Sequence, residues 1–311
     1  MSFNIYFAGA QFDSEVGKDI RLNHRCVLLS QLNDRSTINK WISEFKANPE
    51  SQCNLFIDSG AFSAWTKGKE IDVDEYIDFI NNNSQYITVA ASVDKIPGEA
   101  RTSNVASEKD VEEAAKATWE NFLYMRSKLN DKSKLLYTFH VGEPWYFLKQ
   151  ALEYKDEFGK IDYLAIGGLV GKNKDIQKAF IEKIFEMIKA SPNPDIKVHG
   201  FGLTRLGYLE QYPFTSADST AWLMTAINGG IFSKWGTLKV SDRSIYRDDH
   251  INNKVEAGQE EIKSYIESKG FTLEELMSND LKRQEWNYRY LSEWSDNYSY
   301  RPNIGKNKKL F

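Results

Sequence analysis

Three aspartates follow short apolar runs of the sequence and together could perform a substitution at a sugar carbon. They are Asp58, Asp94 and Asp218, and each has Gly, Ser or Thr within two residues. In such a reaction one carboxylate attacks the anomeric carbon C1′, and a second carboxyl group handles the proton of the leaving or incoming group. Two carboxyl groups that lie close together tend to differ in pKa, which separates the two roles. A third carboxylate could accept hydrogen bonds from the N–H edge of a purine.

Histidine and glycine residues follow three other apolar runs. They are His140 with Glu143, then Gly167, Gly168 and Leu169, then His199 and Gly200. Glycine at a strand end permits close approach of the backbone to a flat ligand and leaves N–H donors accessible. Each feature also has a structural interpretation: helix N-caps for the aspartates, a first-turn acid for Glu143, tight turns for the glycines and structural hydrogen bonds for the histidines. Because aspartates recur at several strand ends, we favour the functional interpretation.

The histidines and cysteines form no metal-ligand pattern. The four histidines have neither HxH nor HExxH spacing, and the two cysteines, Cys26 and Cys53, form no CxxC pair. We therefore expect no histidine-based metallohydrolase, no cysteine-rich zinc site, no bound metal and no cofactor. Both cysteines lie in or beside apolar runs, which indicates reduced and buried thiols.

Short apolar runs rich in β-forming residues alternate with longer segments of helical period. We expect strands at 4–7, 26–30, 54–57, 87–93, 135–139, 163–166, 196–198 and 215–217, and helices at 37–47, 73–81, 108–128, 146–157, 176–190 and 222–229. This alternation indicates parallel strands joined by crossover helices. Eight strands predict an α/β fold, a (β/α)8 barrel, and a doubly wound open sheet is the alternative. In a barrel the C-terminal strand ends meet at one face, which would bring the aspartates and glycines to one mouth.

The pattern changes after about residue 230. We predict a catalytic barrel over residues 1–230 and a C-terminal extension over 231–311 that completes the barrel and is a candidate for contact with nucleic acid. Within the extension we expect a hairpin strand at 236–240, a polar loop at 241–253, helices at 255–269 and 273–294, and an irregular tail from 297.

Composition and charge narrow the class of protein. Of the 311 residues, 41% are hydrophobic and 27% are charged, which suffices for a core without disulfides or metals. Lys+Arg 40 against Asp+Glu 44 gives a net charge of −4, which argues against a globally basic nucleic-acid binder but not against a local basic patch. The N-terminus lacks a signal-peptide pattern, and no apolar stretch is long enough to span a membrane. A cytoplasmic protein without a membrane partner is therefore expected.

Four motifs resemble those of tRNA-guanine (queuine) transglycosylases. DSGAFS at 58–63 resembles their DSGGFQ-type motif, and IGGLVG at 166–171 resembles their GGLAVGE-type loop. HGFGLT at 199–204 and SADSTAW at 216–222 resemble the glycine-containing strand and the nucleophile motif of the family. The motifs occur in the family's order. These variants look closest to the phage and bacterial 7-deazaguanine DNA transglycosylases, a branch of the same superfamily.

The resemblance implies a (β/α)8 barrel and a metal-free, two-step exchange of a guanine base. By motif, Asp218 resembles the nucleophile that attacks C1′, Asp58 the general acid/base, and Asp94 the aspartate that binds the Watson–Crick edge of guanine. The backbone at Gly168 and Leu169 resembles the segment that contacts the base. The other substrate-binding residues expected at this site are Ser59, Gly60, Phe62, His140, Gly167, His199 and Gly200, with Phe62 as a hydrophobic wall or stacking surface.

Two departures from the family pattern bear on the substrate. Val141 precedes Gly142 where the family usually carries Gln, so a contact to the purine carbonyl oxygen is lost or taken by His140. No Cys follows Cys53, so the cysteine-rich zinc subdomain of the tRNA enzymes is absent. We therefore expect DNA and a 7-deazaguanine base as partners. Exchange on tRNA or a nucleoside, a hydrolytic glycosidase, and a non-catalytic barrel that binds nucleic acid or a base are the alternatives.

The C-terminal segment is the first candidate for holding DNA. Between residues 282 and 311, Lys and Arg outnumber Asp and Glu seven to three, with Trp and Tyr interleaved. Basic and aromatic residues suit a phosphate track with stacking surfaces, and a base in a duplex must be flipped out to reach a pocket. The alternative is a helix that packs its aromatic residues onto the barrel and carries an exposed basic tail. The loop with Lys234, Lys239, Arg243 and Arg247 is a second candidate for phosphate contact.

Overall fold

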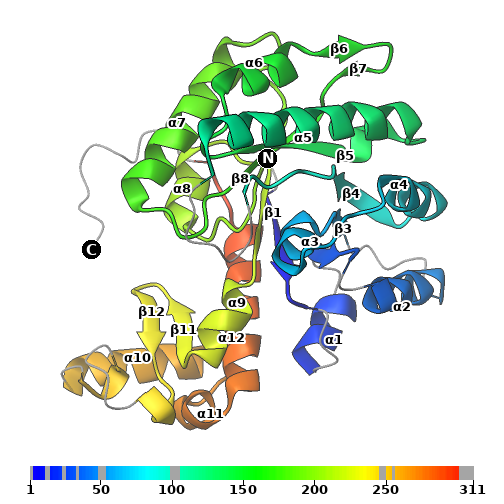
Figure 1. The fold of residues 1–311 in the computed structure, drawn as a ribbon. Coiled ribbons are helices and arrows are strands. Elements are labelled where there is room, and N and C mark those ends of the chain that lie inside the picture. The colour runs from blue at the N-terminus through cyan, green and yellow to red at the C-terminus, as the bar shows by residue number, and fades with distance from the viewer. Residues whose placement is uncertain are drawn as a thin grey trace. The chain divides into compact units, whose positions relative to one another are not determined.

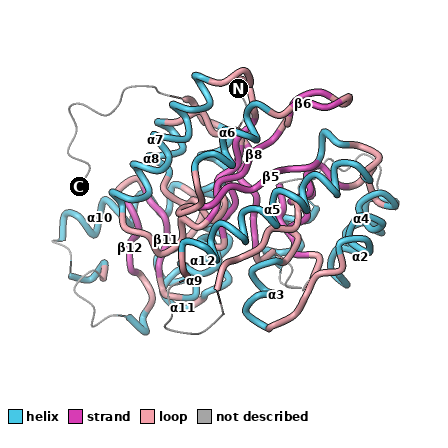
Figure 2. Tube along the Cα trace, turned by 45° about the horizontal axis from the view of Figure 1, so that its top comes forward, coloured by secondary structure: helices cyan, strands magenta, loops and turns pink. Residues whose placement is uncertain are grey.

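Eight parallel strands close into a barrel, with helices around them (Figure 1, Figure 2). The computed structural model describes residues 3–10, 15–22, 26–32, 35–47, 54–98, 106–244, 250–253 and 256–300. In chain order the barrel strands are β1 (Asn4–Ala8), β2 (Cys26–Ser30), β3 (Leu55–Asp58), β4 (Ile87–Ala91), β5 (Leu135–His140), β8 (Tyr163–Gly167), β9 (Lys197–Gly200) and β10 (Ser216–Ser219). The prediction of a (β/α)8 barrel is confirmed. The open-sheet alternative is wrong, because β1 pairs with β2 on one side and with β10 on the other.

Helices lie between successive strands and cover the outside of the barrel. They are α1 (Glu15–Leu22), α2 (Arg35–Ala47), α3 (Ala61–Lys67), α4 (Val73–Asn82), α5 (Glu108–Lys128), α6 (Trp145–Glu153), α7 (Lys174–Ala190) and α8 (Leu206–Gln211). Sequence reasoning missed α1, α3 and α8, because helices of only six to eight residues carry too few turns for a hydrophobic period.

Side-chain caps set the starts of the longer helices. Asp72 accepts a hydrogen bond from the N–H of Glu75 at the start of α4, and Asn173 accepts from Ile176 at the start of α7. Ser107 opens α5 with a capping box that it shares with Asp110. Each cap satisfies backbone donors that the first turn of a helix leaves without partners. Local sequence therefore defines where these crossover helices begin.

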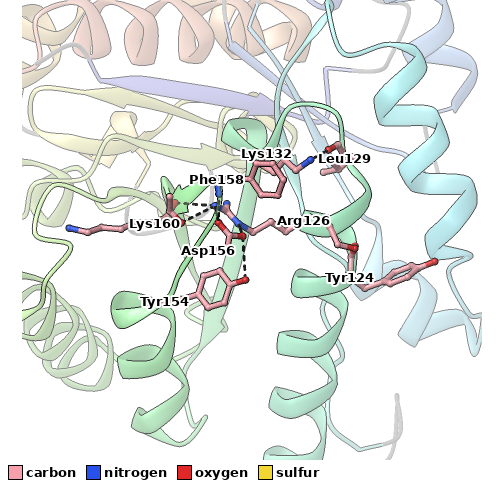
Figure 3. A network of polar contacts seen from close by, with 10 residues as sticks. Tyr124, Arg126, Leu129, Lys132, Tyr154, Asp156, Phe158 and Lys160 are labelled. Carbon is pink, nitrogen blue, oxygen red and sulfur yellow. Dashed lines mark hydrogen bonds and ion pairs between the residues drawn. The ribbon is translucent and has the colours of Figure 1, made fainter.

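Helix α6 ends four residues earlier than the predicted helix 146–157. The chain turns at this point into a short hairpin of β6 (Lys155–Asp156) and β7 (Gly159–Lys160). Arg126 of α5 holds the hairpin: it is only 2% exposed and binds both carboxylate oxygens of Asp156, at 2.8 and 3.1 Å (Figure 3). Its guanidinium also donates to the backbone carbonyls of Gly159 and Lys160. The buried guanidinium of Arg126 needs several acceptors, and the β6–β7 hairpin supplies them where the sequence pattern predicted a continued helix.

The interior of the barrel is filled by side chains of its own strands. The buried residues of this cluster are Tyr6, Cys26, Phe56, Val89, Ala91, Leu136, Tyr163 and Ala165. The imidazole of His199 belongs to the same interior, with its ring centroid 4.8 Å from that of Phe56 and 4.7 Å from that of Phe201. The expectation of a buried Cys26 is confirmed, whereas Cys53 and His24 lie outside the described residues. A packed interior means that ligands can be bound only at a barrel end.

A second compact unit combines Asp13–Asp19 with Thr220–Tyr298. It contains α9 (Ala221–Ile227), β11 (Gly230–Ser233), β12 (Gly236–Lys239), α10 (Glu256–Ser268), α11 (Leu273–Ser278) and α12 (Asp280–Asp296). The unit starts at Thr220, earlier than the predicted boundary after residue 230. Among the described residues it adds no strand to the barrel, because pairing of β1 with β10 has already closed the sheet.

Two predictions for this second unit need correction. The predicted helix 273–294 is interrupted at Asn279, whose extended backbone and side chain cap the start of α12 by accepting from Leu281 and Lys282. The predicted loop 241–253 contains two short 3-10 turns, Asp242–Ser244 and Ile251–Asn253, and its residues 245–249 lie outside the described part. The predicted hairpin is confirmed as β11 paired antiparallel with β12.

The aromatic residues of α12 are used in part for packing. Trp286 and Tyr288 are buried, and the indole N–H of Trp286 donates to the carbonyl of Phe232 at 2.7 Å. In the candidate phosphate loop, the ammonium of Lys234 lies 3.3 Å from Glu261 and that of Lys239 donates to the carbonyl of Asn228. Trp286 therefore packs within the second unit, in one buried cluster with Ile231 and Phe271.

Residues 99–105, Arg247 and residues 301–311 lie outside the described part of the chain. Within the described ranges, every helix is too short or too polar to cross a lipid bilayer.

Candidate active site

Asp218 is held at one of its two carboxylate oxygens. It lies in β10, in register with Tyr6 of β1, and it is 8% exposed. Its Oδ1 accepts a hydrogen bond from the backbone N–H of Gly202 at 2.8 Å and lies 3.2 Å from Nε2 of His199. No described residue donates to Oδ2. Two contacts on Oδ1 orient the carboxylate and leave Oδ2 as the oxygen that can act on a bound molecule.

A buried chain of polar side chains lies behind Asp218. His199 is completely buried, and its Nδ1 lies 2.6 Å from Oγ of Ser216. The same Oγ lies 2.6 Å from the hydroxyl of Tyr163. Burial raises the pKa of Tyr163 to about 12, although its hydrogen bond with Ser216 acts in the opposite direction. Tyr163 therefore stays protonated and can donate a hydrogen bond at neutral pH.

Asp94, His140 and Glu143 form a second chain of contacts. Nε2 of His140 lies 3.1 Å from Oδ2 of Asp94, and its Nδ1 lies 2.8 Å from Oε1 of Glu143. Burial disfavours the charged imidazole, but hydrogen bonds and the negative charges of both carboxylates outweigh burial and raise the pKa of His140 to about 10. His140 is thus an imidazolium at neutral pH, with both ring N–H groups engaged. It keeps no N–H for a purine carbonyl oxygen, which favours loss of that contact over its replacement by His140.

The segment that follows β3 links Asp58 to Asp94. Oδ2 of Asp58 accepts a hydrogen bond from the N–H of Gly60 at 3.0 Å. Ser59 is completely buried, and its Oγ accepts from the N–H of Ala61 at 3.3 Å and lies 3.5 Å from Oδ1 of Asp94. Burial, followed by the charges of Asp58 and Asp94, raises the pKa of Tyr76, so both carboxylates act on the same phenol. Asp58 and Asp94 therefore belong to one electrostatic neighbourhood.

The helix-capping interpretation of the three aspartates is wrong. The N-caps of α3, α5 and α9 are Gly60, Ser107 and Thr220. The first-turn interpretation of Glu143 fails as well, since α6 has Pro144 as its N-cap and Glu143 pairs with His140. The carboxylates thus contact side chains and the backbone of turns at the C-terminal strand ends, and they cap no helix among those described.

Glycine is required at two positions of the motifs, because neighbouring side chains lie too close to the backbone there to leave room for a Cβ. A Cβ on Gly167 would lie 2.6 Å from Cδ2 of His140, so only glycine leaves room for the imidazole. Gly60 has a φ of +82°, and a Cβ there would lie 2.6 Å from that of Leu32. Of the remaining predicted residues, Gly168 is exposed, whereas Leu169 and Gly200 are buried.

Phe62 and a neighbouring pocket lie on the α3 side of the site. Phe62 is 66% exposed, and its ring centroid lies 5.9 Å from that of Trp65. A pocket of about 540 Å³ lies between α3 and the segment after β4, and Asp94 forms part of its wall with Trp65, Ile71 and Ile96. This volume is in the range of small-molecule binding sites.

Sequence reasoning missed three residues that support the site. Gln177 of α7 donates to the carbonyls of Leu169 and Lys172, at 2.9 and 3.1 Å, and so holds the loop after β8. Tyr163 carries no signal in the sequence, because it opens an apolar strand. Ser216 lies inside the motif around Asp218, and its place in that motif was the one feature of the sequence that could have pointed to it.

The fold and these contacts define the class: a (β/α)8 barrel with three aspartates at the C-terminal ends of its strands, the face at which TIM-barrel enzymes carry their active sites. Neither a protein-family model nor a curated protein sequence matches the chain. Within the described residues, no three His, Cys, Asp or Glu side chains are grouped to hold a metal ion.

Proposed function

We propose that the protein is a pentosyltransferase that exchanges guanine in DNA for a 7-deazaguanine base through a covalent aspartyl-sugar intermediate. The observation that carries the proposal is the oriented carboxylate of Asp218, with Oδ1 engaged by Gly202 and His199 and Oδ2 left for reaction. The motif resemblance supports the choice of a guanine base. The motif variants look closest to those of the 7-deazaguanine DNA transglycosylases, which supports DNA over tRNA.

In the first step, Oδ2 of Asp218 attacks C1′ of the deoxyribose. The bond between C1′ and N9 breaks, its electron pair passes to guanine, and the acid form of Asp58 supplies a proton to the departing base. Asp94 accepts hydrogen bonds from the N–H edge of the purine. The imidazolium of His140 supports this role, because its Nε2 lies 3.1 Å from Oδ2 of Asp94 and orients the carboxylate.

In the second step, the incoming 7-deazaguanine loses its N9 proton to Asp58 and attacks C1′. The ester bond to Asp218 breaks, and the carboxylate is restored. Two inversions at C1′ give net retention of configuration. We expect the reaction to take place in the cytoplasm, which is that of the host if the protein is encoded by a phage.

Incorporation of radiolabelled guanine tests this function without a guess about the modified base. The protein is incubated separately with double-stranded DNA, single-stranded DNA and unmodified tRNA, and label is counted in the precipitated polymer. We expect label in DNA and its loss in Asp218→Asn, with an unchanged melting temperature for that variant. Near-normal exchange by Asp218→Asn would refute the role of Asp218.

The other outcomes point to the alternatives. Label only in tRNA would identify the tRNA reaction, and alkali-labile abasic sites without incorporation would identify a glycosidase. If no label enters any polymer, the assay is repeated with 7-cyano-7-deazaguanine. Failure of that second assay would leave a barrel that binds without exchange and would refute the proposal.

A further inference from the structure

We propose that Tyr163, Ser216 and His199 form a positioning chain for Asp218, in which His199 is a neutral imidazole with its proton on Nε2. The inference rests on the proposed function for the role of Asp218 as a nucleophile. Its structural part, the protonation state of His199, depends only on the contacts. His199, which the sequence analysis expected to bind substrate, is completely buried behind Asp218. Tyr163 and Ser216 are buried as well, so we infer that each of the three acts through Asp218.

The direction of the hydrogen bonds follows from Asp218, the member of the chain that can only accept. A carboxylate that attacks C1′ is ionised and can only accept. Nε2 of His199, 3.2 Å from Oδ1 of Asp218, must therefore donate. A neutral imidazole that donates from Nε2 accepts at Nδ1, and Nδ1 lies 2.6 Å from Oγ of Ser216. Ser216 donates there and accepts in turn from the hydroxyl of Tyr163, which lies 2.6 Å away.

The contrast with His140 shows why the partner at Nδ1 matters. His140 lies between two carboxylates, neither of which has a proton to give, so both of its ring nitrogens carry protons. His199 lies between one carboxylate and one hydroxyl, and the hydroxyl can supply the proton on the Nδ1 side. His140 and His199 thus differ in protonation because their hydrogen-bond partners differ.

Aromatic side chains surround His199 in the barrel interior. Its imidazole is completely buried, and the rings of Tyr6, Phe56 and Phe201 pack around it. The titratable groups near the chain are Asp218, Tyr163 and Tyr6, together with Cys26, whose charge acts on Tyr163. Water cannot easily replace a lost hydroxyl in this interior, so removal of one member exposes the role of the chain.

Without the hydroxyl of Ser216, Nδ1 of His199 loses its partner, and Asp218 is left as the one member of the chain that still favours the Nε2–H tautomer. The other tautomer presents a lone pair at Nε2 to Oδ1 of Asp218, which is repulsive. We therefore expect Ser216→Ala to lower kcat for guanine exchange by about tenfold to about a hundredfold with KM for the base unchanged. Tyr163→Phe should have a smaller effect, because Ser216 retains its own proton. His199→Gln, whose amide can still donate to Asp218, should retain more activity than His199→Leu.

Two measurements test the inference. Two-bond ¹⁵N–¹H correlation spectra of the histidine-labelled protein report the tautomer directly, and His199→Gln identifies the signal of His199. We expect a neutral Nε2–H imidazole in the wild type and a mixture with the Nδ1–H form in Ser216→Ala. An imidazolium or an Nδ1–H tautomer in the folded wild type would overturn the assignment. The spectra require no activity, so they stand even if no polymer accepts guanine.

Kinetics test the positioning role on the same variants. The matched control is Ser191→Ala, which removes a hydroxyl that donates to the carbonyl of Ile188 in the loop before β9, at the N-terminal end of the barrel. That control should change melting temperature at most, and not kcat. If Ser216→Ala shifts the tautomer and leaves kcat unchanged, the positioning role is refuted. A rise in KM with kcat unchanged would refute it as well, because the chain would then serve binding.

Discussion

Gly167 lies directly against the imidazole of His140: a Cβ built on this glycine would stand 2.6 Å from Cδ2 and 3.0 Å from Nε2. Real side chains do not approach so closely. Because Gly167 of β8 has no side chain, the imidazole of His140 on β5 can lie directly against the β8 backbone. The position of His140, and through it that of Asp94, depends on this glycine.

We predict that Gly167→Ala displaces His140 and weakens its ion pair with Asp94. The expected cost is about 1–3 kcal/mol of folding stability, as for other overpacked sites, together with loss of guanine exchange. Thermal unfolding and the labelled-guanine assay measure both effects. Gly207→Ala on helix α8 is the control, because nothing lies within 4 Å of the added methyl group there. Equal effects of the two substitutions would contradict the steric argument.

The stability contributed by His140 should depend on pH. Its pKa is raised from 6.5 to about 10 in the folded protein, so folding favours its charged form. This contribution is fully present below about pH 6.5, declines as pH increases and is lost above about pH 10. The melting-temperature advantage of the wild type over His140→Gln should shrink across that range. Asn193→Ala, which removes a buried amide that donates to the carbonyl of Ile161 and has no titrating proton, serves as the control and should show no such trend.

Exposed Phe62 should matter for substrate and not for folding. Its ring is 66% exposed, so Phe62→Ala removes little buried surface and should leave the melting temperature unchanged. If the ring stacks on a base, KM for DNA should increase by about tenfold. Steady-state kinetics with DNA measure this effect. Phe158→Ala provides an aromatic control of similar exposure, on the hairpin that precedes β8, and an equal increase there would refute a specific role for Phe62.

The buried ion pair of Arg126 should contribute to stability alone. Asp156→Ala leaves a buried guanidinium without its carboxylate and should cost about 3 kcal/mol of unfolding free energy. Guanine exchange should persist, because β6 and β7 precede β8 and lie at the end opposite the aspartates. Denaturant titration and the exchange assay separate the two properties. Glu75→Ala breaks the exposed pair with Arg35 and should cost less than about 1 kcal/mol. A loss of exchange in folded Asp156→Ala would contradict this division.

Local sequence determined the strands and most of the crossover helices. Apolar runs and caps such as Asp72, Ser107 and Asn173 act over a few residues, so their signals can be read along the chain. The helix ends at Glu153 and Asn279 were mispredicted, because a long-range contact of Arg126 or a local cap overrode the helical period. The aspartates at strand ends could be predicted, since parallel strands present their C-terminal ends at one face.

Only the tertiary structure decided which side chains meet. Asp94, which follows β4, pairs with His140 of β5. Asp218 of β10 pairs with His199 of β9, and Tyr163 of β8 pairs with Ser216 of β10. Periodicity along a strand says which face a residue occupies, but nothing about its neighbour across the barrel. That neighbour depends on strand order and register, which are set when β1 and β10 close the sheet. The partners of His140 and His199 follow from that closure, and so they could not be predicted from the sequence.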